Sequence, residues 1–115
     1  MFIALDYDDT YTKDPTLWNA FIGAAQQRGH TVACVTWRRN NAVEAPDVLR
    51  LHQLHGMPVY FTDRRAKLQH MANQGIRVDV WIDDRPDAIL TDEQIFGGGR
   101  PQDKRPTQAA ACAIQ

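Results

Sequence analysis

Short apolar runs alternate with segments of helical pattern along most of this 115-residue chain, and this alternation is the feature that most constrains its fold. The apolar runs, each about as long as one strand, cover residues 1–5, 31–36, 57–61 and 78–82. The helical segments cover residues 16–28, 46–55 and 64–74. Strands that alternate with helices at this length favour a parallel sheet with helices on both faces, joined by right-handed crossovers. We therefore predict an α/β chain with a three-layer, Rossmann-like parallel sheet.

Capping residues and glycines mark the predicted ends of the helices. Asp14 followed by Pro15 predicts the start of the first helix, because proline suits the first helical position. Thr62 and Asp63 are predicted to cap the third helix. Glycines end the three helical segments, at Gly29, Gly56 and Gly75. The side chains predicted to be buried are Leu17, Trp18, Phe21, Ile22 and Ala25 in the first helix and Val48, Leu51 and Leu54 in the second.

The C-terminal residues carry weaker patterns. Residues 86–90 predict a short helix, and residues 94–96 predict a brief edge strand. Three glycines at 97–99 precede Arg100, Pro101 and a polar, alanine-rich end, a composition that suits a flexible tail. A glycine loop that binds phosphate is the alternative, but such a loop leads from a strand into a helix, and prolines follow this one. We therefore expect one domain over residues 1–96 and a flexible tail over residues 97–115.

Composition and charge argue against several classes of protein. No apolar run approaches the roughly 20 residues of a membrane helix, and Asp6 interrupts the N-terminal run, so we expect a cytoplasmic protein without a secretory signal. The net charge of −1 gives no overall attraction to nucleic acid or membranes. Cys34 and Cys112 are far apart, so free thiols are expected rather than a disulfide or a cysteine zinc site. His52 and His55 share a predicted helix face but lack a third zinc ligand.

Two acidic clusters follow two of the predicted strands. Asp6 and Asp8 come directly after the first apolar run, and Asp83 and Asp84 come directly after the fourth. Because the carboxyl ends of parallel strands meet at one edge of the sheet, these clusters can face each other. Carboxylates brought together repel unless a cation lies between them or one of them is protonated. The sequence therefore predicts a metal-dependent site at this edge.

Further polar residues at the same edge complete an ordered set of motifs. The set consists of Asp6, Asp8 and Thr10 in the pattern Asp-x-Asp-x-Thr, then Thr36, then Lys67, then Asp83 and Asp84. This order resembles the haloacid dehalogenase (HAD) superfamily of phosphotransferases, over residues 2–87. The resemblance implies a HAD-like fold and phosphoric monoester hydrolase activity. The position between Asp8 and Thr10 is often glycine in that superfamily, whereas this chain has Asp9.

The resemblance implies a catalytic role for four of these residues. Asp6 would attack phosphorus and form an aspartyl-phosphate, which splits one displacement into two. Asp8 would protonate the leaving oxygen and then activate water. Thr36 would donate a hydrogen bond to a phosphoryl oxygen, and Lys67 would stabilise the nucleophile and the developing charge. Two arginines precede Lys67 in the same predicted turn, so the choice of Lys67 depends on the resemblance alone.

The cofactor that the resemblance implies is Mg²⁺. The ion would be held by Asp6, by the backbone carbonyl of Asp8 and by Asp83, Asp84 or both, all of them hard oxygen ligands. Its charge would allow an anionic nucleophile to approach an anionic phosphate.

Members of the superfamily usually carry a cap domain, inserted after the first motif or between the second and third. Here the residues between Asp8 and Thr36, and those between Thr36 and Lys67, suffice only for the helix and strand already assigned. We therefore expect no cap domain and an open site. An open site suits a large substrate whose phosphate projects into the cleft, or a site closed by a neighbouring subunit of a homo-oligomer.

Basic and aromatic residues also follow the strand ends. The predicted substrate-binding residues are Thr10, Trp37, Arg38, Arg39, Arg64, Arg65 and Arg85. Arginine forks bind phosphate oxygens in pairs, and Trp37 could stack on a base. Residues 80–85, Val-Trp-Ile-Asp-Asp-Arg, are similar to a motif of the phosphatase domain of polynucleotide kinase 3′-phosphatases. Nucleotides or nucleic-acid 3′-phosphate ends are therefore candidate substrates, and the alternative is that these arginines pair with nearby aspartates and balance the charge of the site.

We therefore expect a magnesium-dependent phosphomonoester hydrolase that acts through an aspartyl-phosphate. One alternative is a small-metabolite phosphatase or phosphotransferase whose site is closed by an oligomeric neighbour. The other is a non-catalytic, phosphate-binding regulatory module. Such a module would be expected to lack Asp6 or Asp8, and this chain has both.

Overall fold

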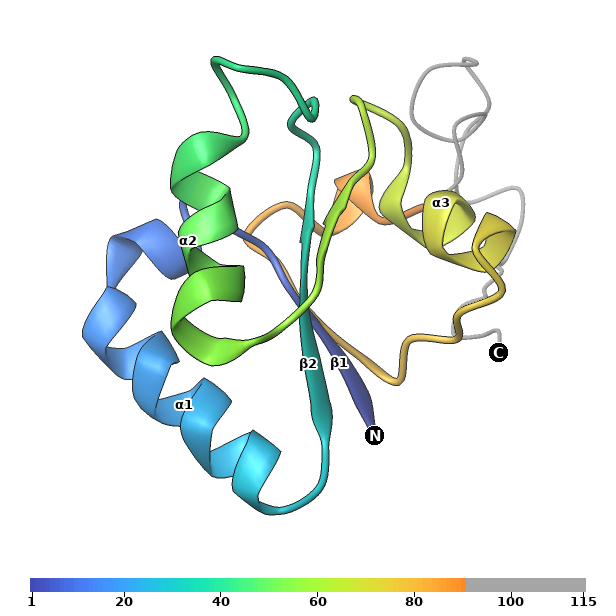
Figure 1. Cartoon of the computed structure of the whole chain (residues 1–115). Helices are drawn as coiled ribbons and strands as arrows, with labels where there is room; N and C mark the ends of the chain where they lie inside the picture. Colours follow the sequence, from blue (N-terminus) through green and yellow to red (C-terminus); the bar gives the residue numbers. More distant parts are fainter. Residues whose placement is uncertain (91–115) are drawn as a thin grey trace.

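Residues 1–90 form an α/β structure in the computed structural model, and these are the residues that the structure describes (Figure 1). The strands are β1 (Phe2–Leu5), β2 (Thr31–Thr36), β3 (Val59–Phe61) and β4 (Val80–Ile82). The helices are α1 (Pro15–Gln27), α2 (Pro46–His55) and α3 (Lys67–Asn73), with short 3₁₀-helices η1 (Tyr11–Lys13) and η2 (Pro86–Ala88). Strands and helices alternate in chain order, which confirms the predicted pattern.

All neighbouring strands pair in parallel, in the order β3-β2-β1-β4. The chain first adds β2 and β3 on one side of β1, and it then returns to place β4 on the other side. Ala4 of β1 accordingly pairs with Ala33 on one side and with Trp81 on the other. Such a reversal of strand order opens a crevice at the carboxyl ends of the two strands concerned, the place where doubly wound sheets bind ligands.

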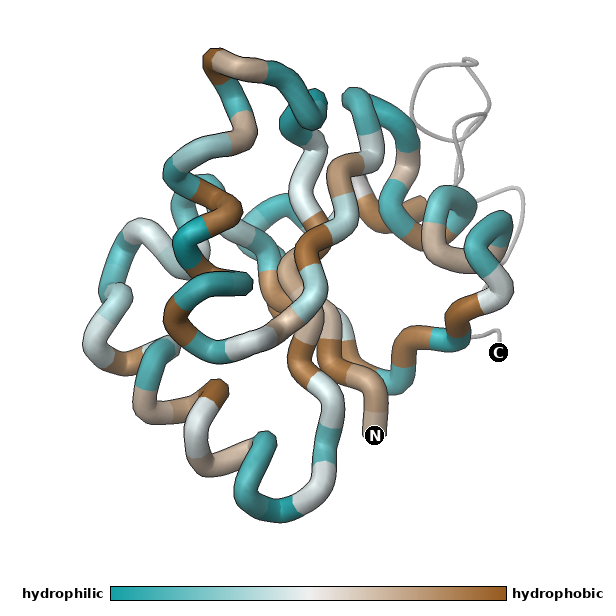
Figure 2. Tube along the Cα trace, in the orientation of Figure 1, coloured by the Kyte–Doolittle hydropathy of each residue, from teal (hydrophilic) through white to brown (hydrophobic). Residues whose placement is uncertain are grey.

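The strands are mostly apolar (Figure 2), and their side chains belong to two hydrophobic clusters, one on each face of the sheet. α1 and α2 lie on one face, and α3 lies on the other (Figure 1). Ile3 and Leu5 pack on the α1 and α2 side, whereas Ala4 between them packs with Met71 of α3, because successive strand side chains alternate. β2 is buried along all but its first residue, as expected for a strand covered on both faces.

The boundary signals in the sequence are confirmed for α1 and α2. The Asp14 side chain accepts a hydrogen bond of 3.2 Å from the Leu17 N–H, and Pro15 occupies the first helical position. Gly56 ends α2 with a φ of 70°, a left-handed conformation that glycine adopts without strain. β3 and β4 each begin two residues later than predicted.

α3 begins at Lys67 rather than at residue 64, so the predicted start and the Thr62 and Asp63 cap were wrong. Asp63 and Arg64 have φ values of 56° and 67°, which a right-handed helix cannot contain. This segment instead packs on the residues that follow β2, where the Arg64 N–H donates a hydrogen bond of 2.8 Å to the Trp37 carbonyl.

Two leucines that were predicted to be buried are exposed, Leu17 by 54% and Leu54 by 64%. An α-helix turns by about 100° per residue, so Leu54 lies about 120° around α2 from Val48, which is buried. Leu17 lies about 140° around α1 from the buried Ile22. Two successive steps of three residues, as from Val48 to Leu51 to Leu54, therefore place the third side chain off the buried face of the helix.

Some of the remaining expectations concern residues 1–90, and others concern residues beyond the part that the structure describes. The short helix predicted over residues 86–90 is present as η2. Cys34 is buried in β2 and is a free thiol, as expected. No helix within residues 1–90 has the length and apolar character to cross a membrane. The predicted strand at 94–96, the tail at 97–115 and Cys112 lie outside the described residues.

Candidate active site

Asp6 lies at the crevice between β1 and β4. Its backbone N–H donates a hydrogen bond of 2.9 Å to the Ile82 carbonyl, which extends the pairing of β1 and β4 beyond the end of β1. Its backbone carbonyl accepts a hydrogen bond of 3.3 Å from the Tyr11 N–H at the start of η1. These two bonds fix the buried Asp6 at the carboxyl edge of the sheet.

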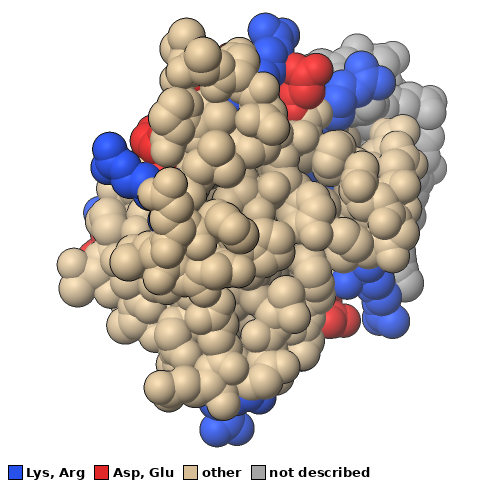
Figure 3. Space-filling model, in the orientation of Figure 1, with Lys and Arg blue, Asp and Glu red and all other residues tan. Residues whose placement is uncertain are grey.

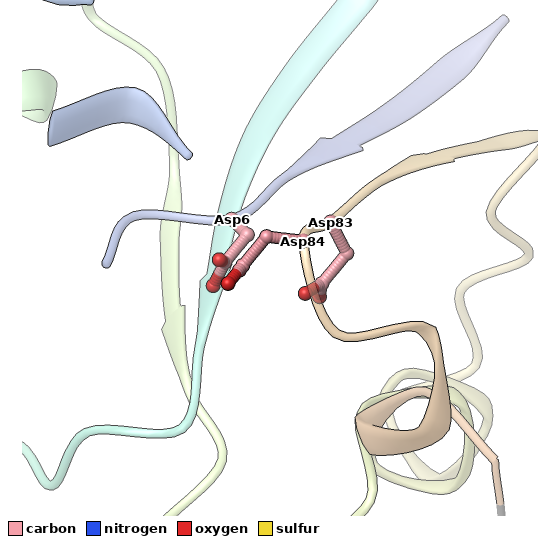
Figure 4. Close-up of side chains that lie close together, drawn as sticks. All are labelled: Asp6, Asp83 and Asp84. Atoms are coloured by element: carbon pink, nitrogen blue, oxygen red, sulfur yellow. The ribbon is translucent and has the colours of Figure 1, made fainter. Parts of the chain in front are cut away.

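Asp6, Asp83 and Asp84 bring three carboxylates together at this edge (Figure 4). One carboxylate oxygen from each residue lies within 4.8 Å of the other two. The side chains of Asp6 and Asp83 are almost fully buried, whereas Asp84 is exposed, so the group is open to solvent at Asp84. The ends of the first and fourth strands therefore meet as the sequence suggested. Within residues 1–90, the Asp8 carboxylate is not part of this group.

Lys67, the first residue of α3, binds two of these carboxylates. Its Nζ atom lies 2.7 Å from Asp6 Oδ1 and 2.6 Å from Asp83 Oδ2. The Lys67 side chain is only 3% exposed. Arg64, one of the two arginines that precede it, instead pairs with Glu44 at 2.9 Å. The geometry therefore distinguishes Lys67 as the cation that contacts Asp6, which the sequence alone could not do.

The Thr10 hydroxyl connects the ends of β1 and β4. It lies 3.0 Å from Asp6 Oδ2 and 3.2 Å from Asp84 Oδ1, and it accepts a hydrogen bond of 3.2 Å from the Asp84 N–H. A hydroxyl has one proton, so Thr10 can donate to only one of the two carboxylates at a time. Thr10 is therefore a bridge between two carboxylates in this structure.

Burial raises the pKa of Asp6 to about 7, although the neighbouring Lys67 acts in the opposite direction. A hydrogen bond shared with Asp84 also raises the pKa of Asp6, and the same bond lowers the pKa of Asp84. Below about pH 7, and without a metal ion, Asp6 therefore keeps a proton that it shares with Asp84 through this hydrogen bond. A cation bound between them would displace that proton, because metal ligands must be ionised.

The Asp8 carboxylate pairs with Arg38. Nε and Nη2 of Arg38 donate to Asp8 Oδ2 and Oδ1 at 2.9 and 2.7 Å. On the other side of the guanidinium, Nη1 donates to Asp47 Oδ1 at 2.7 Å and to the Glu44 carbonyl at 2.9 Å. The guanidinium carbon also lies 5.0 Å from the centre of the Tyr7 ring, within the range of a cation–π contact. Arg38 is thus fixed by partners from two other segments of the chain, the turn after β1 and the start of α2.

Other arginines at this edge also pair with carboxylates. The pairs are Arg39 with Asp63 at 2.7 Å, Arg64 with Glu44 at 2.9 Å and Arg85 with Asp87 at 3.1 Å. Figure 3 shows basic and acidic side chains next to one another at the top of the view, over the loops that follow β2 and β3. The Arg85 guanidinium carbon lies 5.5 Å from the centre of the Trp37 ring. These pairs agree with the alternative in which the arginines balance the charge of the site.

A cleft of about 380 Å³ opens beside the carboxylates. The residues that line it are Asp6, Asp8, Asp9, Trp37, Arg38, Glu44, Arg64, Lys67, Asp83, Asp84 and Arg85. Six of them are acidic and four are basic, so the cleft has a formal excess of negative charge. Among the described residues, the lining leaves out four that the sequence suggested as contacts to substrate or phosphate, namely Thr10, Thr36, Arg39 and Arg65.

Thr36 ends β2 and is buried. Its hydroxyl accepts a hydrogen bond of 3.3 Å from the Arg38 N–H, and its carbonyl accepts one of 2.8 Å from the Thr62 N–H. These bonds hold the segment after β3 against the segment after β2. In this structure Thr36 therefore supports the backbone at Arg38.

Asp9 lies in the turn after β1, in a backbone conformation that favours glycine. Asp9 has a φ of 62°, in the left-handed region that glycine adopts freely and aspartate tolerates better than most residues. Its N–H donates a hydrogen bond of 2.9 Å to Thr12 Oγ1. This turn directs the chain from Asp8 toward η1 and leaves Asp9 at the cleft.

The sequence did not identify Glu44 and Asp47 as parts of the site. Glu44 lines the cleft and accepts a hydrogen bond of 3.2 Å from the Arg39 N–H, and Asp47 binds Arg38. Asp47 follows Pro46 in the first turn of α2, where acidic residues are common because they favour the helix dipole. No sequence signal distinguishes Asp47 from an ordinary residue of a helix N-terminus.

No protein-family model, no curated protein and no solved structure matches this chain. The geometry of the fold and of the site is therefore the basis for the functional proposal below.

Proposed function

We propose that this chain is a magnesium-dependent phosphomonoester hydrolase of the uncapped HAD type, with Asp6 as its nucleophile. The observation that carries this proposal is the position of Asp6, which is bound by Lys67 and lies within reach of Asp83 and Asp84 at the crevice of the sheet. A nucleophilic carboxylate, a cation that holds it and two further carboxylates are the groups that phosphoryl transfer through an aspartyl-phosphate requires.

The carboxylate group fits a divalent cation. Three carboxylate oxygens lie within 4.8 Å of one another, and carboxylates are the hard oxygen ligands that Mg²⁺ prefers. The lining of the cleft has two more acidic than basic side chains, and a bound cation would offset this excess of negative charge. Asp6, Asp83 and Asp84 would hold the ion, and the Asp8 backbone carbonyl is the further ligand that the family resemblance implies. When bound, Mg²⁺ supplies positive charge that lets an anionic nucleophile approach an anionic phosphate.

Asp6 would act as the nucleophile of the first half-reaction. One of its oxygens forms a bond to phosphorus while the bond from phosphorus to the leaving oxygen breaks, and the product is an aspartyl-phosphate. Lys67 holds Asp6 Oδ1 at 2.7 Å, which fixes the carboxylate and favours its ionised form. In the second half-reaction, water attacks phosphorus, phosphate is released and the Asp6 carboxylate is restored.

Asp8 would move the protons. It lies two residues after Asp6 and lines the same cleft, with a side chain that is 50% exposed. It gives a proton to the leaving oxygen in the first half-reaction and takes a proton from water in the second. A regulatory module that only binds phosphate would have no need of such a group.

The charge of the cleft favours a substrate with one phosphate group. Arg38, Arg64 and Arg85 line the cleft, but each already binds a carboxylate of the protein. Together with the acidic excess, these pairs weaken the expectation that the arginines attract a polyanion. A nucleic-acid 3′-phosphate end is the second candidate, since Trp37 at the cleft offers an aromatic ring beside Arg85.

Phosphate release from a set of substrates would test this proposal. We would compare mononucleotides, sugar phosphates and 3′-phosphorylated oligonucleotides, each with Mg²⁺ and with EDTA. The proposal predicts release from at least one class, in the presence of Mg²⁺ only. Release that is equal with EDTA would contradict the role of the metal, and transfer to added alcohols in place of water would identify a phosphotransferase.

A further inference from the structure

Arg38 presents two different edges to its surroundings. Its Nη1 atom faces Asp47 and the Glu44 carbonyl, which lie at the start of α2 and just before it. Its Nε and Nη2 atoms form a paired contact with both oxygens of Asp8. The first edge is bound at the start of α2, and the second edge is bound by Asp8 on the turn after β1, next to Asp6 in the cleft.

The two edges differ in how their partners are held. Asp47 also accepts a hydrogen bond of 3.4 Å from the Tyr7 hydroxyl, and the Tyr7 ring lies against the guanidinium. The Asp8 and Asp47 side chains are exposed to similar extents, 50% and 44%, but the edge at Asp47 has two further hydrogen bonds, from the Tyr7 hydroxyl to Asp47 and from Arg38 Nη1 to the Glu44 carbonyl. Asp8 can therefore leave Arg38 for solvent more easily than Arg38 can leave Asp47.

The edge that Asp8 occupies is the one that suits a phosphate. A guanidinium binds carboxylate and phosphate in the same way, with two parallel N–H donors to two oxygens of the anion. Both Arg38 and Asp8 line the cleft that contains Asp6. A phosphate group in this cleft and the Asp8 carboxylate would therefore compete for the same pair of donors.

We propose that Asp8 occupies the phosphate-binding edge of Arg38 in the free protein, and that substrate phosphate displaces it while Asp47 holds the guanidinium in place. This inference deepens the proposed function and rests on it. The exchange keeps Arg38 paired at both edges and releases the Asp8 carboxylate into the cleft, where it transfers protons. Asp47 is then a positioning residue. A substrate without two anionic oxygens on one group would not displace Asp8 from Arg38.

Binding of inorganic phosphate in the presence of Mg²⁺ tests this exchange without relying on turnover. The dissociation constant would be measured by calorimetry, and the Arg38 Nε–H resonance would be followed by NMR. Asp8→Asn removes the competitor from Arg38. Asp9→Asn is the matched control, because Asp9 also lines the cleft and asparagine tolerates its left-handed backbone, but Arg38 makes no hydrogen bond to Asp9 among those found in residues 1–90.

The exchange predicts that Asp8→Asn tightens phosphate binding about two- to fivefold more than Asp9→Asn does, the range for a partly exposed ion pair. It also predicts that Asp47→Asn weakens phosphate binding, although this change removes negative charge near the cleft. Simple electrostatics predicts the opposite sign for Asp47→Asn. Phosphate should also shift the Arg38 Nε–H resonance in the wild-type protein.

Equal tightening by Asp8→Asn and Asp9→Asn would overturn the exchange, and so would tighter binding in Asp47→Asn. In either case the pair of Arg38 and Asp8 is an ordinary surface ion pair. The two proposals fail separately. A protein that releases phosphate from esters but lacks this binding pattern retains the proposed function, and a protein with the pattern but no turnover retains only the phosphate site.

Discussion

Lys67 Nζ donates a hydrogen bond of 2.7 Å to Asp6 Oδ1, although 61 positions separate the two residues. Both side chains are almost fully buried, with 3% and 8% of their surfaces exposed. The pair joins the start of α3 to the end of β1, and the same ammonium group binds Asp83 after β4. The Lys67 ammonium group therefore connects three segments at the carboxyl edge of the sheet. We expect it to stabilise the fold as well as the candidate site.

Replacing Lys67 by methionine should destabilise the protein by about 3–5 kcal/mol, because it leaves buried carboxylates without their cation. The free energy of unfolding would be measured by urea denaturation in EDTA. Lys13→Met is the control, since Lys13 is exposed at the end of η1 and its replacement should change stability by less than about 0.5 kcal/mol. Similar effects of the two substitutions would show that the ammonium group does not stabilise this edge.

The raised pKa of Asp6 predicts a specific pH dependence of stability without metal. From about pH 4 to pH 7, the folded protein keeps a proton on Asp6 that the unfolded chain has lost, so this group's contribution to stability falls as pH rises. Asp6→Asn removes the titration. The difference in unfolding free energy between Asp6→Asn and the wild type should therefore move in favour of the variant by a few kcal/mol between pH 5 and pH 8. A difference that stays constant with pH would mean that the Asp6 pKa is not raised.

Magnesium binding should be coupled to the same proton. Below about pH 7 the ion must displace the proton shared by Asp6 and Asp84. The apparent affinity for Mg²⁺ should therefore fall by up to about tenfold for each pH unit by which the pH is lowered. Calorimetry in buffers of different ionisation enthalpy would measure the protons released. Changing Asp83 and Asp84 together to asparagine should weaken Mg²⁺ binding sharply, whereas Asp87→Asn should not. Normal affinity in the double variant would remove the residues after β4 from the metal site.

The turn at Asp9 should prefer glycine. At a φ of 62°, Asp9→Gly should be more stable than Asp9→Ala by about 1 kcal/mol, because alanine has the Cβ clash without the local hydrogen bonding of aspartate. Thermal unfolding of the two variants in parallel would measure the difference. Equal stability would indicate that the backbone leaves the left-handed region once Asp9 is replaced.

The alternation of strands and helices and the meeting of the acidic clusters were accessible from the sequence, because they depend on local patterns. Alternating apolar runs and helical segments predict parallel strands, and parallel strands bring Asp6 and Asp84 to one edge. The first residue of α3 was not accessible, because the left-handed residues Asp63 and Arg64 are set by packing against the segment after β2. Because of that packing, Lys67 contacts Asp6, whereas Arg64 pairs with Glu44.

The partners of the arginines were also beyond the sequence. Arg38 could be assigned to the edge of the sheet from its position after β2, but its pairing with Asp8 and Asp47 depends on side-chain directions in three separate segments. The sequence offered two alternatives, a site that attracts polyanions and a site balanced by ion pairs. Only the geometry favours the second, because most of these arginines pair with carboxylates that are distant in the sequence, Arg85 with Asp87 being the exception.

The rate of phosphate release by Asp6→Asn tests the central claim most directly. The amide has the shape of the carboxylate but cannot form an aspartyl-phosphate, so the variant should lose at least about a thousandfold in rate, or ~4 kcal/mol in barrier, while remaining folded. Asp87→Asn makes the same chemical change outside the cleft and should retain the wild-type rate, on the substrate that the wild type hydrolyses best with Mg²⁺. An Asp6→Asn variant within about tenfold of the wild-type rate would contradict the assignment of Asp6 as the nucleophile.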